Sequence, residues 1–369
     1  MKLAVIHFFD LAKYPPAMNL VKLLASGENA PELIVYTRSE TAAIDGVKII
    51  RYPLKEKSGK VARMAGYLSF YLKVFRKLAS TAPDTVLYYE TLSFPAVYLY
   101  LLWNRLRGRK VRVFCHYHEY TSPQEYITTM KLNGMSHALE RRSYQHFSWI
   151  SHTNQDRMRL FLKDIGQRPD QRHHIYPNYP PRSWQQQENS RTQIPPVRLV
   201  YVGALDFSTT YIREISTWVN TQEEYTLDVY SGQYSPELEA FFASLDQSRV
   251  KFHKGVSYYE LPNVLKDKHI GLILYKGHIL NYVYNEPNKF FEYLVNGLNV
   301  WYPKEMEGLK KWRSGGIIEV DFAGSIPALV PEQLSADLSA LSCENASKEI
   351  INQLFFFNRK GHKELRKEH

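Results

Sequence analysis

Short apolar runs alternate with longer helical patterns along the chain, and this alternation occurs twice. Most apolar runs of the first half are solid rather than alternating in polarity, as in parallel strands buried on both faces. The helical patterns between them supply the crossovers, so we predict an α/β fold with helices on both faces of each sheet. In the first half the expected strands are residues 3–8, 33–36, 47–50, 85–89, 111–114 and 149–151, and the expected helices are 18–25, 61–78, 96–106 and 136–144.

A polar stretch separates the two series of strands. Residues 182–196 are flanked by prolines, contain Gln185, Gln186 and Gln187, and offer nothing to build a core, so they are expected to link two domains. The domain boundaries predicted in this way are an N-terminal domain over 1–182, a linker over 183–196, a C-terminal domain over 197–345, and a C-terminal helix with a basic tail over 346–369. In the second half the expected strands are residues 198–202, 226–230, 250–253, 270–275, 298–301 and 317–320.

Composition narrows the class of protein. Two cysteines in 369 residues exclude a disulfide scaffold and a four-thiolate zinc site. The longest apolar run, residues 94–103, is half of the roughly 20 residues that a membrane helix needs, and the apolar start at residues 3–9 is too short for a signal peptide. We therefore expect a cytoplasmic protein, or one that rests on the inner face of the membrane.

Charge is divided unevenly between the halves. Residues 1–185 hold 27 Lys and Arg against 14 Asp and Glu, which gives 27 − 14 = +13, and the remainder has 20 − 23 = −3. A basic first half points to an anionic partner such as lipid head groups, nucleic acid or a phosphorylated substrate, and simple solubility is the alternative. Nucleic acid is the weaker option, because no recognised binding module is present.

Several familiar motifs are missing from the sequence. There is no Gly-x-Gly-x-x-Gly after a strand, no Walker loop, no Gly-x-Ser-x-Gly and no His-Glu-x-x-His. Asp-x-Asp, the usual carboxylate clamp for a metal–nucleotide complex, is absent too. These absences argue against a dehydrogenase, a kinase, a serine hydrolase or a metalloprotease.

The segment after the strand at 270–275 carries most of the chemistry. Pro287 suits the first position of a helix and Gly297 suits the left-handed position after its end, so a helix is expected from about 287 to 296. A helix N-terminus attracts anions. Lys289 lies in its first turn and Glu292 lies three residues on, on the same face. The ammonium suits a diphosphate and the carboxylate suits two vicinal hydroxyls, which is what a sugar nucleotide presents; an ordinary Lys–Glu pair on an amphipathic helix is the alternative.

This segment resembles a known signature. The string from Glu286 to Leu294, followed by Gly297, is similar to the donor site of GT-B glycosyltransferases, in particular retaining family four (glycosyl transferases group 1). Other pieces fall in the order of that family: residues 199–203 resemble the first strand and glycine turn of the donor domain, residues 250–261 the segment beside the base, and residues 175–179 the end of the acceptor domain.

The resemblance implies two Rossmann-like domains facing a cleft, with the C-terminal helix returning to the N-domain. It implies a hexosyltransferase that is retaining and independent of metal, needs no cofactor, and moves a sugar from a nucleotide-sugar donor to a carbohydrate or lipid-linked acceptor in bacterial-type polysaccharide or glycoconjugate synthesis. Carried over by position, Glu292 binds the ribose, Lys289 stabilises the departing diphosphate, and the Gly203 turn admits the phosphate. The rest of the expected donor-binding set is Val256, Ser257, Tyr284, Glu286 and Asn288.

The chain departs from the family pattern at two points. Tyr284 stands where a first carboxylate often lies eight residues before the second, and Glu286 is two residues out of register. Residues 204–206 replace the basic residue that often follows the glycine turn, and Arg213 and Lys276 are the candidates to substitute for it. Two further functions therefore stay open: a sugar-nucleotide epimerase on the same fold, and a catalytically weak glycosyltransferase-like subunit that scaffolds a partner.

Histidines gather after the strand at 111–114. His116 and His118 could ligate a metal, but no third ligand is evident. The resemblance equates His118 and Glu119 with the His-Glu of these enzymes, in which the histidine touches the donor sugar near the scissile bond. His118, Glu119 and Lys289 are therefore the expected catalytic residues, and a packed histidine is the alternative. The pair at 173–174 is expected to lie on the surface without a role.

Two basic segments of the N-terminal domain could contact an anionic membrane. Residues 105–112 are rich in Arg and follow the apolar run, and residues 55–77 mix Lys and Arg with aromatic side chains. Basic residues near an anionic leaflet each contribute about 1 kcal/mol. The alternative is that the aromatic side chains face the core and the basic ones face solvent.

Overall fold

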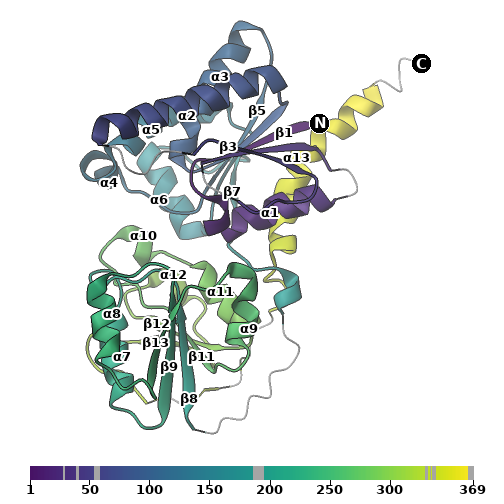
Figure 1. The fold of residues 1–369 in the computed structure, drawn as a ribbon. Helices are drawn as coiled ribbons and strands as arrows, with labels where there is room; N and C mark the ends of the chain where they lie inside the picture. Colours follow the sequence, from purple (N-terminus) through teal and green to yellow (C-terminus); the bar gives the residue numbers. More distant parts are fainter. Residues whose placement is uncertain are drawn as a thin grey trace. The chain divides into compact units, whose positions relative to one another are not determined.

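The chain forms two compact units. The computed structural model describes residues 1–27, 30–38, 41–53, 59–185, 195–328, 331, 332, 334 and 338–364. Unit 1 comprises Met1–Pro177 and Cys343–His369, and unit 2 comprises Asn178–Ser342 (Figure 1). Each unit is built on its own parallel sheet, as the run of solid apolar segments predicts.

Unit 1 contains a seven-stranded sheet in the order β3-β2-β1-β4-β5-β6-β7. All of its strand pairs are parallel. The chain builds outward from β1 to β3, then returns to place β4 on the other side of β1, so the strand order reverses between β1 and β4. The strands are β1 (Lys2–His7), β2 (Glu32–Thr37), β3 (Val47–Arg51), β4 (Thr85–Tyr89), β5 (Arg112–Tyr117), β6 (Trp149–His152) and β7 (His173–Ile175).

Helices cover both faces of this sheet. One face packs on α2, α3, α5 and α6 and the other on α1 and α13, because successive residues of β1 alternate between the two cores. The α-helices of unit 1 are α1 (Pro15–Ser26), α2 (Lys60–Thr81), α3 (Phe94–Leu106), α4 (Pro123–Thr128), α5 (Lys131–Arg141), α6 (Gln155–Ile165) and α13 (Cys343–Glu364). Three 3₁₀ helices are η1 (Leu11–Lys13), η2 (Thr91–Ser93) and η3 (Tyr144–His146).

The C-terminal helix returns to unit 1, as expected. Ile350 and Leu354 of α13 lie in the same core as α1, and α13 runs beside α1 in Figure 1. Tyr176 Oη and Ser347 Oγ are 2.9 Å apart, and Arg112 donates to the carbonyl of Leu354 at 2.9 Å. The helix is therefore part of the N-terminal fold although it follows unit 2 in the sequence.

Unit 2 contains a six-stranded parallel sheet in the order β10-β9-β8-β11-β12-β13. Its strand order reverses between β8 and β11. The strands are β8 (Val197–Val202), β9 (Tyr225–Ser231), β10 (Val250–Lys254), β11 (Ile270–Leu272), β12 (Asn299–Pro303) and β13 (Ile317–Val320). The helices are α7 (Ile212–Asn220), α8 (Pro236–Ala243), α9 (Leu261–Leu265), α10 (Leu280–Val283), α11 (Asn288–Val295) and α12 (Glu307–Lys310), with 3₁₀ helices η4 (Arg182–Trp184) and η5 (Tyr258–Glu260). Two cores, one on each face, hold this sheet.

The prediction that His173 and His174 lie on the surface was wrong. Both residues belong to the edge strand β7, and the His173 side chain is 1% exposed. His174 stacks on Trp149 at 3.5 Å between ring centroids, and its Nδ1 lies 2.9 Å from Glu349 on α13. Sequence patterning missed this strand because it is only three residues long and two of them are histidines.

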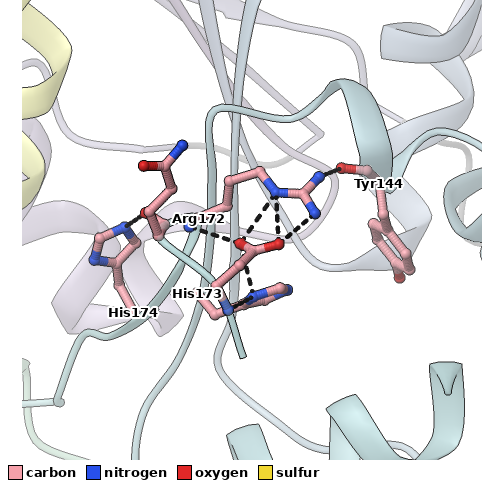
Figure 2. A network of polar contacts seen from close by, with 6 residues as sticks. Tyr144, Arg172, His173 and His174 are labelled. Atoms are coloured by element: carbon pink, nitrogen blue, oxygen red, sulfur yellow. Dashed lines mark hydrogen bonds and ion pairs between the residues drawn. The ribbon is translucent and has the colours of Figure 1, made fainter. Parts of the chain in front are cut away.

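A polar network anchors the start of β7 (Figure 2). Asp170 binds the Arg172 guanidinium through both carboxylate oxygens and lies 3.1 Å from His173 Nδ1. Arg172 also donates to the backbone carbonyl of Tyr144 at 2.8 Å, which joins β7 to η3. The histidines at this edge are therefore structural parts of unit 1.

The helix expected at 287–296 begins one residue later than predicted. Pro287 is the N-cap, with extended backbone angles of φ −71° and ψ 152°, and α11 starts at Asn288. A residue in this conformation lies outside the helix even though its ring suits the first turn. Gly297 has φ +73°, which confirms the left-handed position after the helix end.

Some predictions fall outside the described residues. The expected linker is described only at residues 183–185 and 195–196, and the basic segment at 55–77 is described from residue 59. The side chains of the basic tail lie outside the description as well. No helix among the described residues is long and apolar enough to cross a bilayer. The cleft between the domains stays a prediction.

Candidate functional site

The principal candidate site lies in unit 2 where the strand order reverses. In parallel α/β sheets, ligands bind at the carboxyl ends of the strands at such a reversal. β8 ends at Val202 and is followed by Gly203, and α11 follows β11 through a loop and α10. Contacts between Gly203 and Lys289 show that the start of α11 lies against the end of β8.

Lys289 presents a buried ammonium at this point. Its residue is 9% exposed, and its Nζ lies over the ring of Tyr201 at 4.2 Å and over that of Tyr275 at 5.1 Å. Gly203 has φ +148°, and a Cβ at this position would collide with Lys289 Nζ. Burial lowers the pKa of Lys289 to about 8, so the ammonium is charged at neutral pH but less well solvated than a surface lysine.

Glu292 places a carboxylate on the same helix. It is 6% exposed, and burial raises its pKa to about 7, against the opposing effect of the Lys289 charge. Within the described part of the chain the two groups form no ion pair, and each lacks any other hydrogen bond or ion-pair partner. Burial therefore brings both pKa values toward neutral pH from opposite sides.

The backbone of α11 is held firmly. Every residue from Lys289 to Val295 is buried, and the hydroxyl of Tyr293 accepts a hydrogen bond from the Val202 amide at 3.0 Å. Gly203 N–H donates to the Tyr230 carbonyl at 3.0 Å. Helix and glycine turn are thus tied to the same end of β8, which fixes the two polar side chains relative to the turn.

Glu286 is already engaged within the protein. Its carboxylate lies 2.7 Å from Lys311 Nζ and accepts from Trp312 Nε1 at 3.1 Å. Tyr284 ends α10, and its backbone packs against Gly308 of α12. Asn288 is the half-buried first residue of α11. These contacts indicate that Glu286 and Tyr284 shape the loop before Lys289.

Val256 and Ser257 follow β10, two strands from β8. Neighbouring strands are about 4.8 Å apart, so the two ends lie about 10 Å apart along the edge, which a base and ribose with two phosphates can span. Ser257 forms a capping box with Glu260, its Oγ 2.7 Å from the carboxylate. Val256 lines an open hollow with Tyr230 and Lys268.

The two candidates for the missing basic residue are both paired. Arg213 stacks over the Phe207 ring at 3.8 Å and contacts Glu237 at 3.2 Å. Lys276 Nζ donates to the Phe207 carbonyl at 2.9 Å and lies 3.0 Å from Glu214. Of Arg213, Lys276 and Lys289, only Lys289 has no carboxylate contact among the described residues.

In unit 1, His118 lies beyond the carboxyl end of β5. It is 6% exposed and stacks on Tyr89 at 5.1 Å, with the rings of Tyr14 and His116 at 5.1 and 4.8 Å. Burial lowers its pKa well below the usual value, so the imidazole is neutral at physiological pH. Its Nε2 is buried and has no partner among the described residues. Glu119, the next residue, is exposed.

Glu90 is a residue of interest that the sequence analysis missed. It follows β4, has φ +61° although it is not glycine, and accepts from the His118 amide at 2.6 Å. The Glu119 amide also hydrogen-bonds to it, and burial together with the Glu119 charge raises the Glu90 pKa to about 8. Strained backbone with a perturbed carboxyl group is common at functional sites. Its position just after β4, beside the strand-order reversal, was the available signal.

A metal centre finds no support in the histidine cluster. His116 Nδ1 lies 2.9 Å from Ser151 Oγ, and burial lowers the pKa of His116 to about 3. Among the described residues, no three His, Cys, Asp or Glu side chains are grouped so that they could hold a metal ion.

Comparison with solved structures shows the fold. The apo form of the lipopolysaccharide outer core galactosyltransferase WaaB is 13% identical, with a TM-score of 0.63 over 96% of this chain and 99% of its own. WaaG, a glycosyltransferase involved in lipopolysaccharide biosynthesis, is 14% identical, with a TM-score of 0.62 over 96% of this chain and 92% of its own. HepE from Anabaena in complex with UDP-glucose is 12% identical, with a TM-score of 0.61 over 100% of both chains.

These similarities confirm the pair of Rossmann-like α/β domains expected of the GT-B fold. No protein-family model matches the chain, and no curated protein sequence matches it.

Proposed function

We propose that this chain is a glycosyltransferase that moves a hexose from a nucleotide-sugar donor to a carbohydrate or lipid-linked acceptor. The observation that carries the proposal is the pair of buried and available charges, Lys289 and Glu292, where the strand order of unit 2 reverses. Similar folds in WaaB and WaaG, and a complex of HepE with UDP-glucose, support it. Polysaccharide or glycoconjugate synthesis is the corresponding process.

The proposed roles follow from charge and position. Lys289 and the first amides of α11 stabilise the negative charge that develops on the departing diphosphate. Glu292 accepts hydrogen bonds from the two ribose hydroxyls, and Val256 and Ser257 lie toward the base. The ammonium and the helix N-terminus supply positive charge at the leaving group, so the proposal needs no catalytic metal. If family four applies, the anomeric configuration is retained and the donor phosphate assists deprotonation of the acceptor.

His118 and Glu119 are the proposed catalytic residues of unit 1. A neutral imidazole with a free Nε2 suits a hydrogen bond to a sugar hydroxyl, and it is a poor general acid near pH 7. Glu286 and Tyr284 are proposed to position the loop before Asn288 and Lys289, given the contacts of Glu286 with Lys311.

Calorimetry tests the donor site directly. Wild-type protein is titrated with UDP, GDP, ADP and CDP, and the nucleotide that binds is used with the variants. Glu292→Ala should weaken binding by about 1.5–3 kcal/mol, the scale of hydrogen bonds to a charged group. Glu239→Ala, which removes an exposed carboxylate from α8, is the matched control and should bind as the wild type does. Unchanged affinity in folded Glu292→Ala contradicts the assignment.

The role of Lys289 separates from that of Glu292 in the same assay. Lys289→Ala should lower affinity for the nucleoside diphosphate and leave binding of the free nucleoside nearly unchanged. Equal losses for both ligands contradict a diphosphate contact.

Product analysis separates the competing functions. An epimerase converts the donor sugar without an acceptor, whereas a transferase releases nucleoside diphosphate only as the sugar is transferred or hydrolysed. A scaffold subunit does neither, so any transfer or hydrolysis by the purified chain alone excludes it.

We further propose that the protein is cytoplasmic and rests on an anionic membrane through unit 1. Exposed apolar side chains follow α2 at helical spacing, from Val61 (84% exposed) through Met64 and Leu68 to Leu72. Leu106 at the end of α3 is 85% exposed. Exposed basic residues lie among them: Arg63, Lys73, Arg76, Arg105 and Arg107. Apolar side chains mixed with cations match an anionic bilayer surface.

A further inference from the structure

The ammonium of Lys289 is held by aromatic rings rather than by a counter-ion. Its Nζ lies 4.2 Å from the ring centroid of Tyr201 and 5.1 Å from that of Tyr275. Within the described residues it makes no hydrogen bond and no ion pair. A buried ammonium ordinarily has an acceptor for each of its three N–H groups. Lys289 therefore keeps its hydrogen-bonding capacity for something outside the chain.

Each of the two rings is fixed by other contacts. Tyr201 lies in β8, is 1% exposed and donates its hydroxyl to the Ala204 carbonyl at 2.7 Å. Tyr275 follows β11, pairs with Thr210 in an isolated bridge and stacks on Tyr282 of α10 at 5.0 Å between ring centroids. The two rings thus come from opposite sides of the strand-order reversal. Each ring therefore has contacts besides the one with Lys289.

The two ring faces favour the charged form of Lys289, against the burial that lowers its pKa. The face of an aromatic ring attracts a cation, and this attraction grows when the cation is desolvated. Ring faces accept a cation without forming the directional bonds of a carboxylate, so an anionic ligand can displace water around Nζ without first breaking an ion pair.

We propose that Tyr201 and Tyr275 are positioning residues, which clamp the Lys289 ammonium in place, charged and unpaired, to receive the phosphates of a nucleoside diphosphate. The inference rests on the proposed function for the identity of the ligand. The clamp itself is a property of unit 2 that is measurable without any ligand.

Other titratable groups around Nζ set the expected pH range. Glu292 faces it from α11, and Tyr282 and Tyr293 surround the two clamp rings from α10 and α11. Burial raises the pKa of Tyr201 and of Tyr293 well above the usual value, so these phenols stay neutral. Burial lowers the Lys289 pKa to about 8 and raises that of Glu292 to about 7. Nucleotide affinity should therefore be greatest near pH 7–8 and fall on the alkaline side as Lys289 loses its proton.

The first arm of the experiment measures the clamp in the ligand-free full chain. Lysine labelled with ¹³C at Cε and ¹⁵N at Nζ is incorporated, the Lys289 resonance is assigned with Lys289→Arg, and its titration is followed by NMR. Wild type should titrate near pH 8. Tyr201→Leu and Tyr275→Leu remove a ring face and should each lower the midpoint by about half to one pH unit, since cation–π attraction favours the protonated form. The phenylalanine variants keep the ring and should titrate as wild type does.

Two controls keep this arm decisive. Tyr259→Leu removes a half-exposed ring of unit 2 and should leave the Lys289 midpoint unchanged. If the buried Tyr201→Leu fails to fold, the less buried Tyr275→Leu still tests the ring contact, with Tyr275→Phe as its control. A midpoint that is the same in wild type and in folded Tyr275→Leu overturns the clamp.

The second arm measures nucleotide affinity against pH by calorimetry, with UDP, GDP, ADP, CDP and inorganic pyrophosphate as probes. The leucine variants should bind about tenfold more weakly at pH 8, with the alkaline fall shifted to lower pH by the same amount as in the first arm, and the phenylalanine variants should restore both. Wild type that binds no probe contradicts the proposed function and the receiving role, while the first arm still decides whether the clamp exists. Binding that is equal in all variants at every pH overturns the receiving role alone.

Discussion

Gly203 leaves open the space that the Lys289 ammonium occupies at the edge of the sheet. Its φ of +148° is rarely adopted by L side chains, and a Cβ there would meet Lys289 Nζ. Gly203→Ala should therefore move the ammonium and lower nucleoside diphosphate affinity by about tenfold or more. A tenfold loss corresponds to about 1.4 kcal/mol of binding free energy. Backbone strain should also cost about 1 kcal/mol of folding stability. Calorimetry and thermal melting measure the two effects.

A matched glycine separates strain from collision. Gly108 has φ +67° with nothing within 4 Å of the place where a Cβ would lie, so Gly108→Ala introduces strain in open space. It should lose a similar amount of stability and keep full nucleotide affinity. Equal affinity in both alanine variants contradicts the steric role of Gly203.

Single residues also show where sequence reasoning falls short. Spacing on a helix predicts that Lys289 and Glu292 share one face, and the structure buries both on α11. Tyr201 and Tyr275 escape identification, because nothing in their local sequence distinguishes a tyrosine under an ammonium from an ordinary residue at a strand end. Glu90 offers only its position just after a strand. Their significance arises from neighbours that are distant in the sequence.

At the scale of elements, α13 is a helix that the local sequence pattern predicts. The surface against which it packs belongs to the distant N-terminal part of the chain. Its apolar positions predict a helix, and Ile350 and Leu354 are fully buried against the core beside α1. Truncating either to alanine should destabilise the protein by about 2–5 kcal/mol, the cost of a large-to-small change in a packed core. Asn352→Ala, on the exposed side of the same helix, is the control and should change stability by about 0.5 kcal/mol or less.

Urea denaturation followed by tryptophan fluorescence and circular dichroism provides the measurement. Because Trp149 lies in this same core, its environment reports on unit 1. If Ile350→Ala and Leu354→Ala lose no more folding stability than Asn352→Ala, α13 is dispensable to the N-terminal fold.

At the scale of the whole molecule, the uneven charge predicts where the protein binds. Arg63→Glu with Arg76→Glu should abolish most co-sedimentation with phosphatidylglycerol vesicles at low salt, since each basic residue near the surface contributes about 1 kcal/mol. Lys251→Glu with Lys254→Glu makes the same charge change on exposed positions of unit 2 and should have little effect. High salt should weaken wild-type binding as the Debye length shortens.

The apolar part of the surface is tested separately. Leu68→Ser with Leu72→Ser keeps the charge and removes two exposed side chains of α2, so binding should weaken at high and low salt alike. Equal binding of wild type to neutral phosphatidylcholine and to anionic vesicles contradicts the electrostatic proposal.

Sequence alone determined the two α/β domains, most strand positions and the helix that carries Lys289 and Glu292, because hydrophobic periodicity and helix-end residues act over a few neighbouring positions. Only the tertiary structure decided that the three residues His173–Ile175 form β7, that Pro287 lies just outside α11, and that Lys289 lies over two tyrosine rings. These outcomes depend on packing between segments that are distant in the sequence. Local patterns describe only neighbouring residues, so they do not show which distant segments pack together.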